Sequence, residues 1–112
     1  TEELSMTELD YINSLVTKQI YPCWNIPAGA RGAEKAVVTA DFDIARNGQM
    51  NFVGIYDSTG YDSEATRLVM EDSIRRAILD PRCNPLQEIP PMDKYDHWKE
   101  YRMKFSPEDV IY

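Results

Sequence analysis

A two-stranded β-hairpin is predicted for residues 34–57, which read EKAVVTADFDIARNGQMNFVGIYD. From Glu34 to Arg46 apolar and polar side chains alternate, which is the period of a strand with one buried face. The apolar set is Ala36, Val38, Ala40, Phe42 and Ile44, and the opposite set is Lys35, Thr39, Asp41 and Asp43. Asn47-Gly48 follows, and it predicts a type I′ turn, in which both central residues need positive φ.

The returning strand is predicted from Gln49 to about Asp57. Its alternation is less regular, because the apolar positions change face between Phe52 and Val53. Gly54 lies at this change, and a glycine inside a strand pattern is typical of a β-bulge. We therefore expect the second strand to be bent where the first is regular.

Helices are predicted on both sides of the hairpin. Ser5 and Glu8 have the spacing of a capping box, flanked by Leu4 and Leu9 as a hydrophobic staple. The helix that they open carries an apolar stripe and ends at Pro22; the stripe comprises Leu9, Ile12, Val16 and Ile20. Residues 25–32 hold proline and glycines and predict a loop.

A second helix is predicted from a cap at Asp62 or Ser63 to about Leu79, followed by Pro81. Its expected buried face contains Ala65, Val69, Met70, Ile74 and Ala77. A short third helix is expected from Met92 to about Glu100, and a third strand over Tyr101 to Phe105, where Tyr101, Met103 and Phe105 alternate with Arg102 and Lys104.

The order of elements is therefore α-β-β-α-α-β, which is an α+β fold. If the second helix crosses back over the sheet, the third strand is antiparallel to the first, and the sheet order is 2-1-3. The third strand is then an edge strand, with unpaired backbone groups along one side.

Length and charge restrict the class of protein. A chain of 112 residues has room for one core, so we expect a single domain over residues 1–112. The formal charge of −7 argues against nucleic acid as a partner, because phosphate binding requires a basic surface. No apolar run approaches the roughly 18 residues of a membrane span.

The two cysteines, Cys23 and Cys83, lie beside prolines at the ends of predicted helices. A bond between them is sterically simple and would close a loop of about 60 residues, which stabilises by up to roughly 4 kcal/mol. A disulfide implies an oxidising compartment, and two reduced buried thiols are the alternative. A metal site is not expected, since two cysteines and one histidine are too few ligands.

Catalytic chemistry has few candidates. His97 is the single histidine, and no nucleophile motif accompanies it. Asp41 and Asp43 share a strand face about 6 to 7 Å apart, a separation compatible with paired carboxylates, but a solvated strand face explains them equally well. We expect no catalytic residue and no cofactor.

Basic residues gather near the C-terminal end, namely Lys94, Lys99, Arg102 and Lys104, against Asp96 and Glu100. Charges on an edge strand discourage aggregation through that edge. They would equally attract an acidic peptide to it, and the sequence favours neither reading.

Several short motifs occur in a recognisable order along the chain: Cys23-Trp24-x-x-Pro27-x-Gly29, Asn47-Gly48, Thr59-Gly60, Arg76-Ala77-Ile78, Cys83-Asn84-Pro85-Leu86, Tyr95-x-x-Trp98-Lys99 and Phe105-x-Pro107. With this set the chain resembles the C-terminal domain of the TolA family, in the variety common in alphaproteobacteria. The resemblance runs from about Leu9 to Pro107. The related TonB family shares Tyr21-Pro22 and the turn-helix pattern, and it is the alternative.

The resemblance implies a periplasmic, non-catalytic domain of an inner-membrane-anchored energy transducer in the Tol-Pal system, which maintains the cell envelope and acts in cell division. Partners in the family are TolB-like and Pal-like proteins, and phage coat proteins and some colicins exploit the domain. Strand addition at the last strand would use Tyr101, Arg102, Met103, Lys104 and Phe105 here. An alternative of another class is a small secreted hydrolase that uses Asp41, Asp43 or His97.

Overall fold

The computed structural model describes residues 5–27 and 35–108. Its elements are α1 (Met6–Ile20), the 3₁₀ turn η1 (Tyr21–Cys23), β1 (Val37–Ile44), β2 (Met50–Thr59), α2 (Glu64–Leu79), the 3₁₀ turn η2 (Met92–Lys94), α3 (Tyr95–Trp98) and β3 (Glu100–Phe105). The predicted element order is confirmed. The predicted staple residue Leu4 and most of the predicted loop at 25–32 lie outside the described residues.

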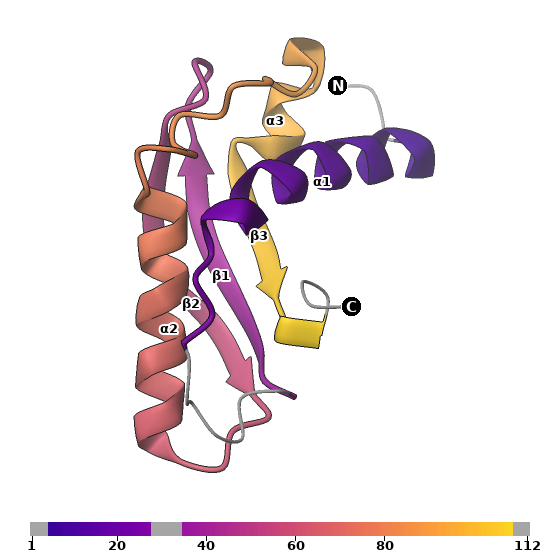
Figure 1. Cartoon of the computed structure of the whole chain (residues 1–112). Helices are drawn as coiled ribbons and strands as arrows, with labels where there is room; N and C mark the ends of the chain where they lie inside the picture. Colours follow the sequence, from indigo (N-terminus) through magenta and orange to yellow (C-terminus); the bar gives the residue numbers. More distant parts are fainter. Residues whose placement is uncertain (1–4, 28–34, 109–112) are drawn as a thin grey trace.

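The three strands form one antiparallel sheet of order β2-β1-β3, so the predicted α+β fold and sheet order are confirmed (Figure 1). β1 is central, and it pairs with β2 on one side and β3 on the other. β1 buries the alternate residues that the sequence predicts, because the described helices cover one face of the sheet.

Both long helices cover that face (Figure 1). The core lies between them and the sheet, and its largest fully buried side chains include Ile12, Phe42, Ile74, Trp98 and Phe105. Asp41, Val53 and Arg102 lie on the opposite face. No helix in the described part of the chain is long and apolar enough to cross a membrane.

The hairpin turn is where it was predicted, but its geometry differs. Only Gly48 has a positive φ, of 93°, so the type I′ prediction for Asn47 is wrong. Asn47 instead accepts a hydrogen bond through Oδ1 from the Gln49 N–H at 3.0 Å, which is a local side-chain turn. A Cβ on Gly48 would also lie 2.8 Å from the Leu86 carbonyl oxygen, so glycine is required there for space as well.

β2 is irregular, as the sequence predicts. Its register against β1 shifts twice, between Thr39 and Ala40 and again between Asp41 and Phe42. Gly54, the partner of Asp41, lies between the two shifts, and the expected bulge is confirmed.

The helix caps follow the sequence closely. Ser5 and Glu8 form both hydrogen bonds of the capping box, at 3.1 and 3.0 Å. Ser63, rather than Asp62, caps α2. Ala65 and Val69 were expected in the core but are exposed, Val69 to 49%, because α2 is turned so that Met70 and Ile78 point inward.

Cys23 and Cys83 are bonded, as predicted, with Cα atoms 6.3 Å apart. The bond ties η1 to the turn that follows α2. It therefore joins the two ends of the segment that contains β1, β2 and α2.

Candidate functional site: the β3 edge

The side of Glu100–Phe105 that faces away from β1, here called the β3 edge, has no neighbouring strand in the described part of the chain. β3 pairs with β1 without interruption, from Val38–Phe105 to Asp43–Glu100. The Ile44 N–H donates to the Lys99 carbonyl at 2.8 Å, which makes 44 and 99 a hydrogen-bonded pair in this register. Hydrogen-bonded pairs alternate in an antiparallel ladder, so Arg102 and Lys104 direct their N–H and C=O groups outward.

Side chains alternate along β3 as predicted. Met103 and Phe105 are buried, while Arg102 and Lys104 are exposed. Tyr101 is also buried, and its hydroxyl donates to Asn13 Oδ1 of α1 at 2.5 Å. Burial raises the pKa of the Tyr101 phenol from 10.0 to about 12, with a smaller contribution from Tyr21. The inward residues thus fix β3 beneath α1.

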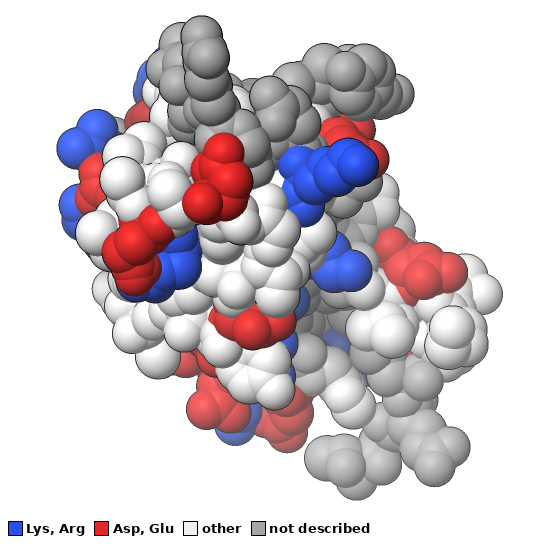
Figure 2. Space-filling view, turned by 90° about the horizontal axis from the view of Figure 1, so that it is seen from below, with Lys and Arg blue, Asp and Glu red and all other residues white. Residues whose placement is uncertain are grey.

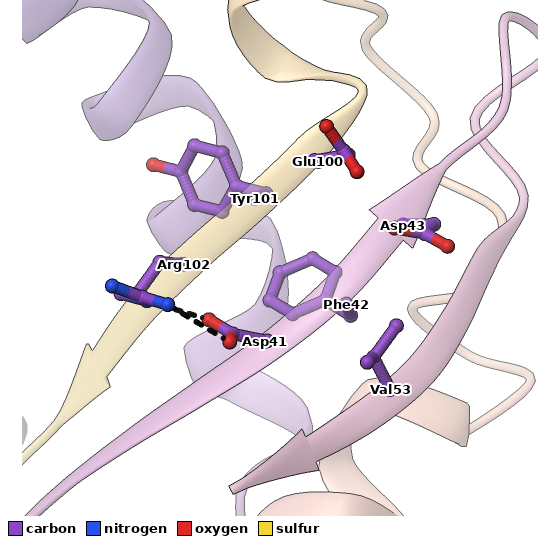
Figure 3. Close-up of a pocket in the computed structure, with 7 residues that line it drawn as sticks. All are labelled: Asp41, Phe42, Asp43, Val53, Glu100, Tyr101 and Arg102. Carbon is purple, nitrogen blue, oxygen red and sulfur yellow. Dashed lines mark hydrogen bonds and ion pairs between the residues drawn. The ribbon is translucent and has the colours of Figure 1, made fainter. Parts of the chain in front are cut away.

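Arg102 has a partner within the domain. Its Nε and an Nη donate to the two carboxylate oxygens of Asp41, on β1, at 2.7 and 3.1 Å (Figure 3). The guanidinium also lies 3.4 Å from the ring centroid of Tyr56 on β2. The hydrogen bonds to Asp41 are the main cause of the raised pKa of Arg102. Arg102 is therefore held flat against the outer face of the sheet.

The other basic residues of this region are mostly neutralised too. Lys94 is buried, with Nζ 3.4 Å from a carboxylate oxygen of Glu8, and Lys99 pairs with Asp96 at 3.3 Å. Lys104 has no ion pair with any described residue. On the face drawn in Figure 2 acidic and basic side chains are interspersed. The sequence grouped four cations, but the fold disperses them and pairs three with acids.

One outward group of the β3 edge is capped. The Tyr21 hydroxyl, in η1, donates to the Lys104 carbonyl oxygen at 2.9 Å. The Tyr21 ring packs edge-on against Phe105, with centroids 5.8 Å apart, and this contact holds the hydroxyl in place. Apart from a tyrosine beside Pro22, no sequence pattern indicates this cap, because the contact joins residues 83 positions apart.

The candidate catalytic residues lie on two elements, Asp41 and Asp43 on β1 and His97 on α3. Asp41 is bound by Arg102, and Asp43 lies two residues further along the same face, across from Glu100 (Figure 3). His97 is exposed on α3. The part of the chain that the structure describes holds no group of three or more His, Cys, Asp or Glu side chains suited to a metal ion. A hollow of about 370 Å³ lies on this face, lined by Asp41, Phe42, Asp43, Val53, Glu100, Tyr101 and Arg102.

Over residues 5–27 and 35–108, fold and site together define an α+β domain in which helices cover one sheet face and leave the other face and the β3 edge uncovered. Neither a protein-family model nor a curated protein nor a solved structure matches the chain.

Proposed function

We propose that this chain is a non-catalytic protein-binding domain of a TolA-type energy transducer, and that it recruits partners by adding their strands to the β3 edge. The observation that carries the proposal is the regular β1–β3 ladder, whose alternation leaves the outward N–H and C=O of Arg102 and the N–H of Lys104 without a partner among the described residues. Backbone groups of this kind supply the affinity in strand addition, whatever the partner's sequence.

The inward side chains make the edge rigid before a partner arrives. Met103 and Phe105 are buried, and Tyr101 is hydrogen-bonded to α1. Because little ordering entropy is then lost on the domain's side, more of the interaction free energy appears as affinity.

The proposed compartment is the periplasm. The Cys23–Cys83 bond supports it, because disulfides persist in oxidising compartments. By resemblance the partners are TolB-like and Pal-like envelope proteins, the parent protein is anchored in the inner membrane, and phage coat proteins and colicins use the same domain.

The test uses the TolB-like protein of the source organism and a pair of variants at one position. Lys104→Pro deletes an outward N–H and leaves the β1–β3 ladder intact, whereas Lys104→Ala keeps the N–H and loses only the charge. We expect Lys104→Pro to weaken binding by about tenfold or more, the value of one lost hydrogen bond with its orphaned partner. Lys104→Ala should weaken it only a few-fold.

Amide chemical-shift mapping of the bound domain locates the site. The expected shifts centre on residues 100–105. Shifts centred on the turn at Asn47-Gly48, with residues 101–105 unchanged, would rule out binding at the β3 edge.

A further inference from the structure

The outer face of β3 carries its charges in a fixed order. Glu100, at the start of the strand, forms no ion pair with a described residue. Arg102, in the middle, is neutralised by Asp41. Lys104, near the end, again forms no ion pair with a described residue. The edge therefore presents an acid, a neutral position and a base, in that order along the chain.

The acidic end is reinforced by its neighbour on β1. Asp43 lies directly opposite Glu100, in a pair that is not hydrogen-bonded, the arrangement in which side chains approach most closely. Like charges opposite one another destabilise a sheet. Both carboxylates line the hollow of Figure 3 together with Val53, which is 62% exposed. A cation beside Glu100 would relieve this repulsion.

The inner side of the β3 edge is apolar, because α1 extends past the sheet. Ile12, Leu9 and Met6 continue one stripe of the helix, and their exposed fractions rise from 1% through 37% to 73%. Figure 1 shows the N-terminal half of α1 projecting beyond β3. An added strand would lie beneath this stripe, with alternate side chains directed toward it.

We propose that the β3 edge selects an antiparallel partner strand whose outward side chains run acid, neutral, base from its N-terminus, with apolar residues between them. This inference rests on the proposed strand addition at the same edge. Antiparallel pairing is the stronger kind and continues the pattern of the sheet. It places the partner's acid beside Lys104, its neutral residue beside Arg102 and its base beside Glu100.

A second copy of the chain carries the same charge order on its own β3, but α1 prevents it from docking there. A two-fold axis through Arg102 would set the two Tyr101 residues about 7 Å apart along the strands. Each Tyr101 lies under its own α1, fixed by the bond to Asn13. Packed helices need about 8–10 Å between axes. The occupant is therefore a single extended segment of another protein, with no helix of its own above it.

The test uses two synthetic peptides, acetylated and amidated to remove terminal charges. The matched peptide is Thr-Glu-Val-Thr-Val-Lys-Thr, and the swapped peptide is Thr-Lys-Val-Thr-Val-Glu-Thr. Amide-shift titration at low ionic strength should give about tenfold tighter binding of the matched peptide, since two exposed charge pairs change from opposite to like. The ratio should shrink toward one in 0.5 M salt, where exposed charges are screened.

A charge-swapped domain, Glu100→Lys with Lys104→Glu, provides the matched control, because both side chains are exposed. Its preference should reverse in favour of the swapped peptide. Equal affinities for both peptides, a preference for the swapped peptide by the unmodified domain, or dimerisation of the free domain through β3 would each overturn the inference.

The proposed function fails on a different result. If neither peptide shifts residues 100–104 but the TolB-like protein does, the charge-order rule is wrong and strand addition stands. If that protein also leaves residues 100–104 unchanged, both are wrong.

Discussion

The two edges of the sheet are built in opposite ways. At the β2 edge, the outward N–H of Met50 donates to Asn84 Oδ1 at 2.8 Å, and the Asn84 amide donates back to the Met50 carbonyl at 2.9 Å. The Leu86 N–H donates to the Gly48 carbonyl at 2.9 Å beside them. At the β3 edge, the Tyr21 hydroxyl caps the Lys104 carbonyl, and no other side chain of the described residues bonds an outward backbone group there.

The two edges differ in how their outward backbone groups are protected from pairing with another strand. Asn84 imitates one residue of a neighbouring strand, and the register shifts of β2 bend the rest of that edge. Over Glu100–Arg102, β3 has no such cap from a described residue and no register shift against β1. Among the described residues, the β2 edge is protected at Met50 and the β3 edge is left open, which is the arrangement that the proposed strand addition requires.

The largest expected effect comes from removing the Cys23–Cys83 bond, which anchors the chain next to Asn84, the residue that caps Met50 at the β2 edge. Reduction of Cys23–Cys83, or Cys23→Ser with Cys83→Ser, should lower the free energy of unfolding by about 4 kcal/mol, the value for closure of a long loop. Chemical denaturation with and without reductant measures it. Hydrogen exchange at the Met50 amide should also accelerate. The exchange rates of the β3 amides that pair with β1 should rise only as much as the loss of global stability predicts. An unchanged midpoint would contradict the role given to the bond.

Alkaline pH should destabilise the domain at Tyr101, which is buried between β3 and α1. The pKa of Tyr101 is 10.0 unperturbed and about 12 in the folded domain, so the folded state holds its proton more firmly. The corresponding stability is present below pH 10 and is lost as the pH rises toward 12, by about 3 kcal/mol. Tyr101→Phe should remove this part of the pH dependence. Equal pH profiles for the two proteins would show that the phenol does not titrate in this way.

Opening the β2 edge by a side-chain change should have a smaller effect. Asn84→Ala leaves the N–H and C=O of Met50 without partners and should lower stability by about 1–2 kcal/mol. Asn84→Asp keeps an acceptor for the N–H but loses the donor to the carbonyl. Its midpoint of thermal unfolding should lie between those of the parent domain and Asn84→Ala. If Asn84→Ala is as stable as the parent, the amide does not function as a cap.

The smallest effect is expected at the β3 cap. Tyr21→Phe keeps the ring against Phe105 and removes the hydroxyl, so stability should fall by only about 1 kcal/mol. Binding of the TolB-like protein should stay equal or improve, because one more outward carbonyl becomes available. Much weaker binding, measured by calorimetry, would mean that the hydroxyl contacts the partner instead of the edge.

The sequence predicts the features of this fold that depend on local chemistry. The capping box at Ser5 and Glu8 and the alternation of β1 each arise within a few residues. The edge position of β3 followed from element order alone, since a crossover helix leaves few arrangements of three strands. The Cys23–Cys83 pair was predictable because the chain has only two cysteines.

The rest required the packed structure. The Asn84 and Tyr21 caps join residues 34 and 83 positions apart, and neither residue type is distinctive for that role. Val69 shows that helical periodicity defines an apolar arc only to within about one residue. The pairing of Arg102 with Asp41 depended on strand register. A hydrophobic pattern determines which face of the sheet a residue lies on, but not which residue of the next strand lies opposite it.

The position of the disulfide has a mechanical consequence. A pull applied between α1 and a partner held on β3 enters the domain before Cys23 and leaves it after Cys83. The covalent path of the load crosses directly from one sulfur to the other. Residues 24–82, with β1, β2 and α2, are therefore outside the loaded path and cannot be drawn out as slack. Tension bears instead on residues 84–99, the segment that leads from Cys83 to β3.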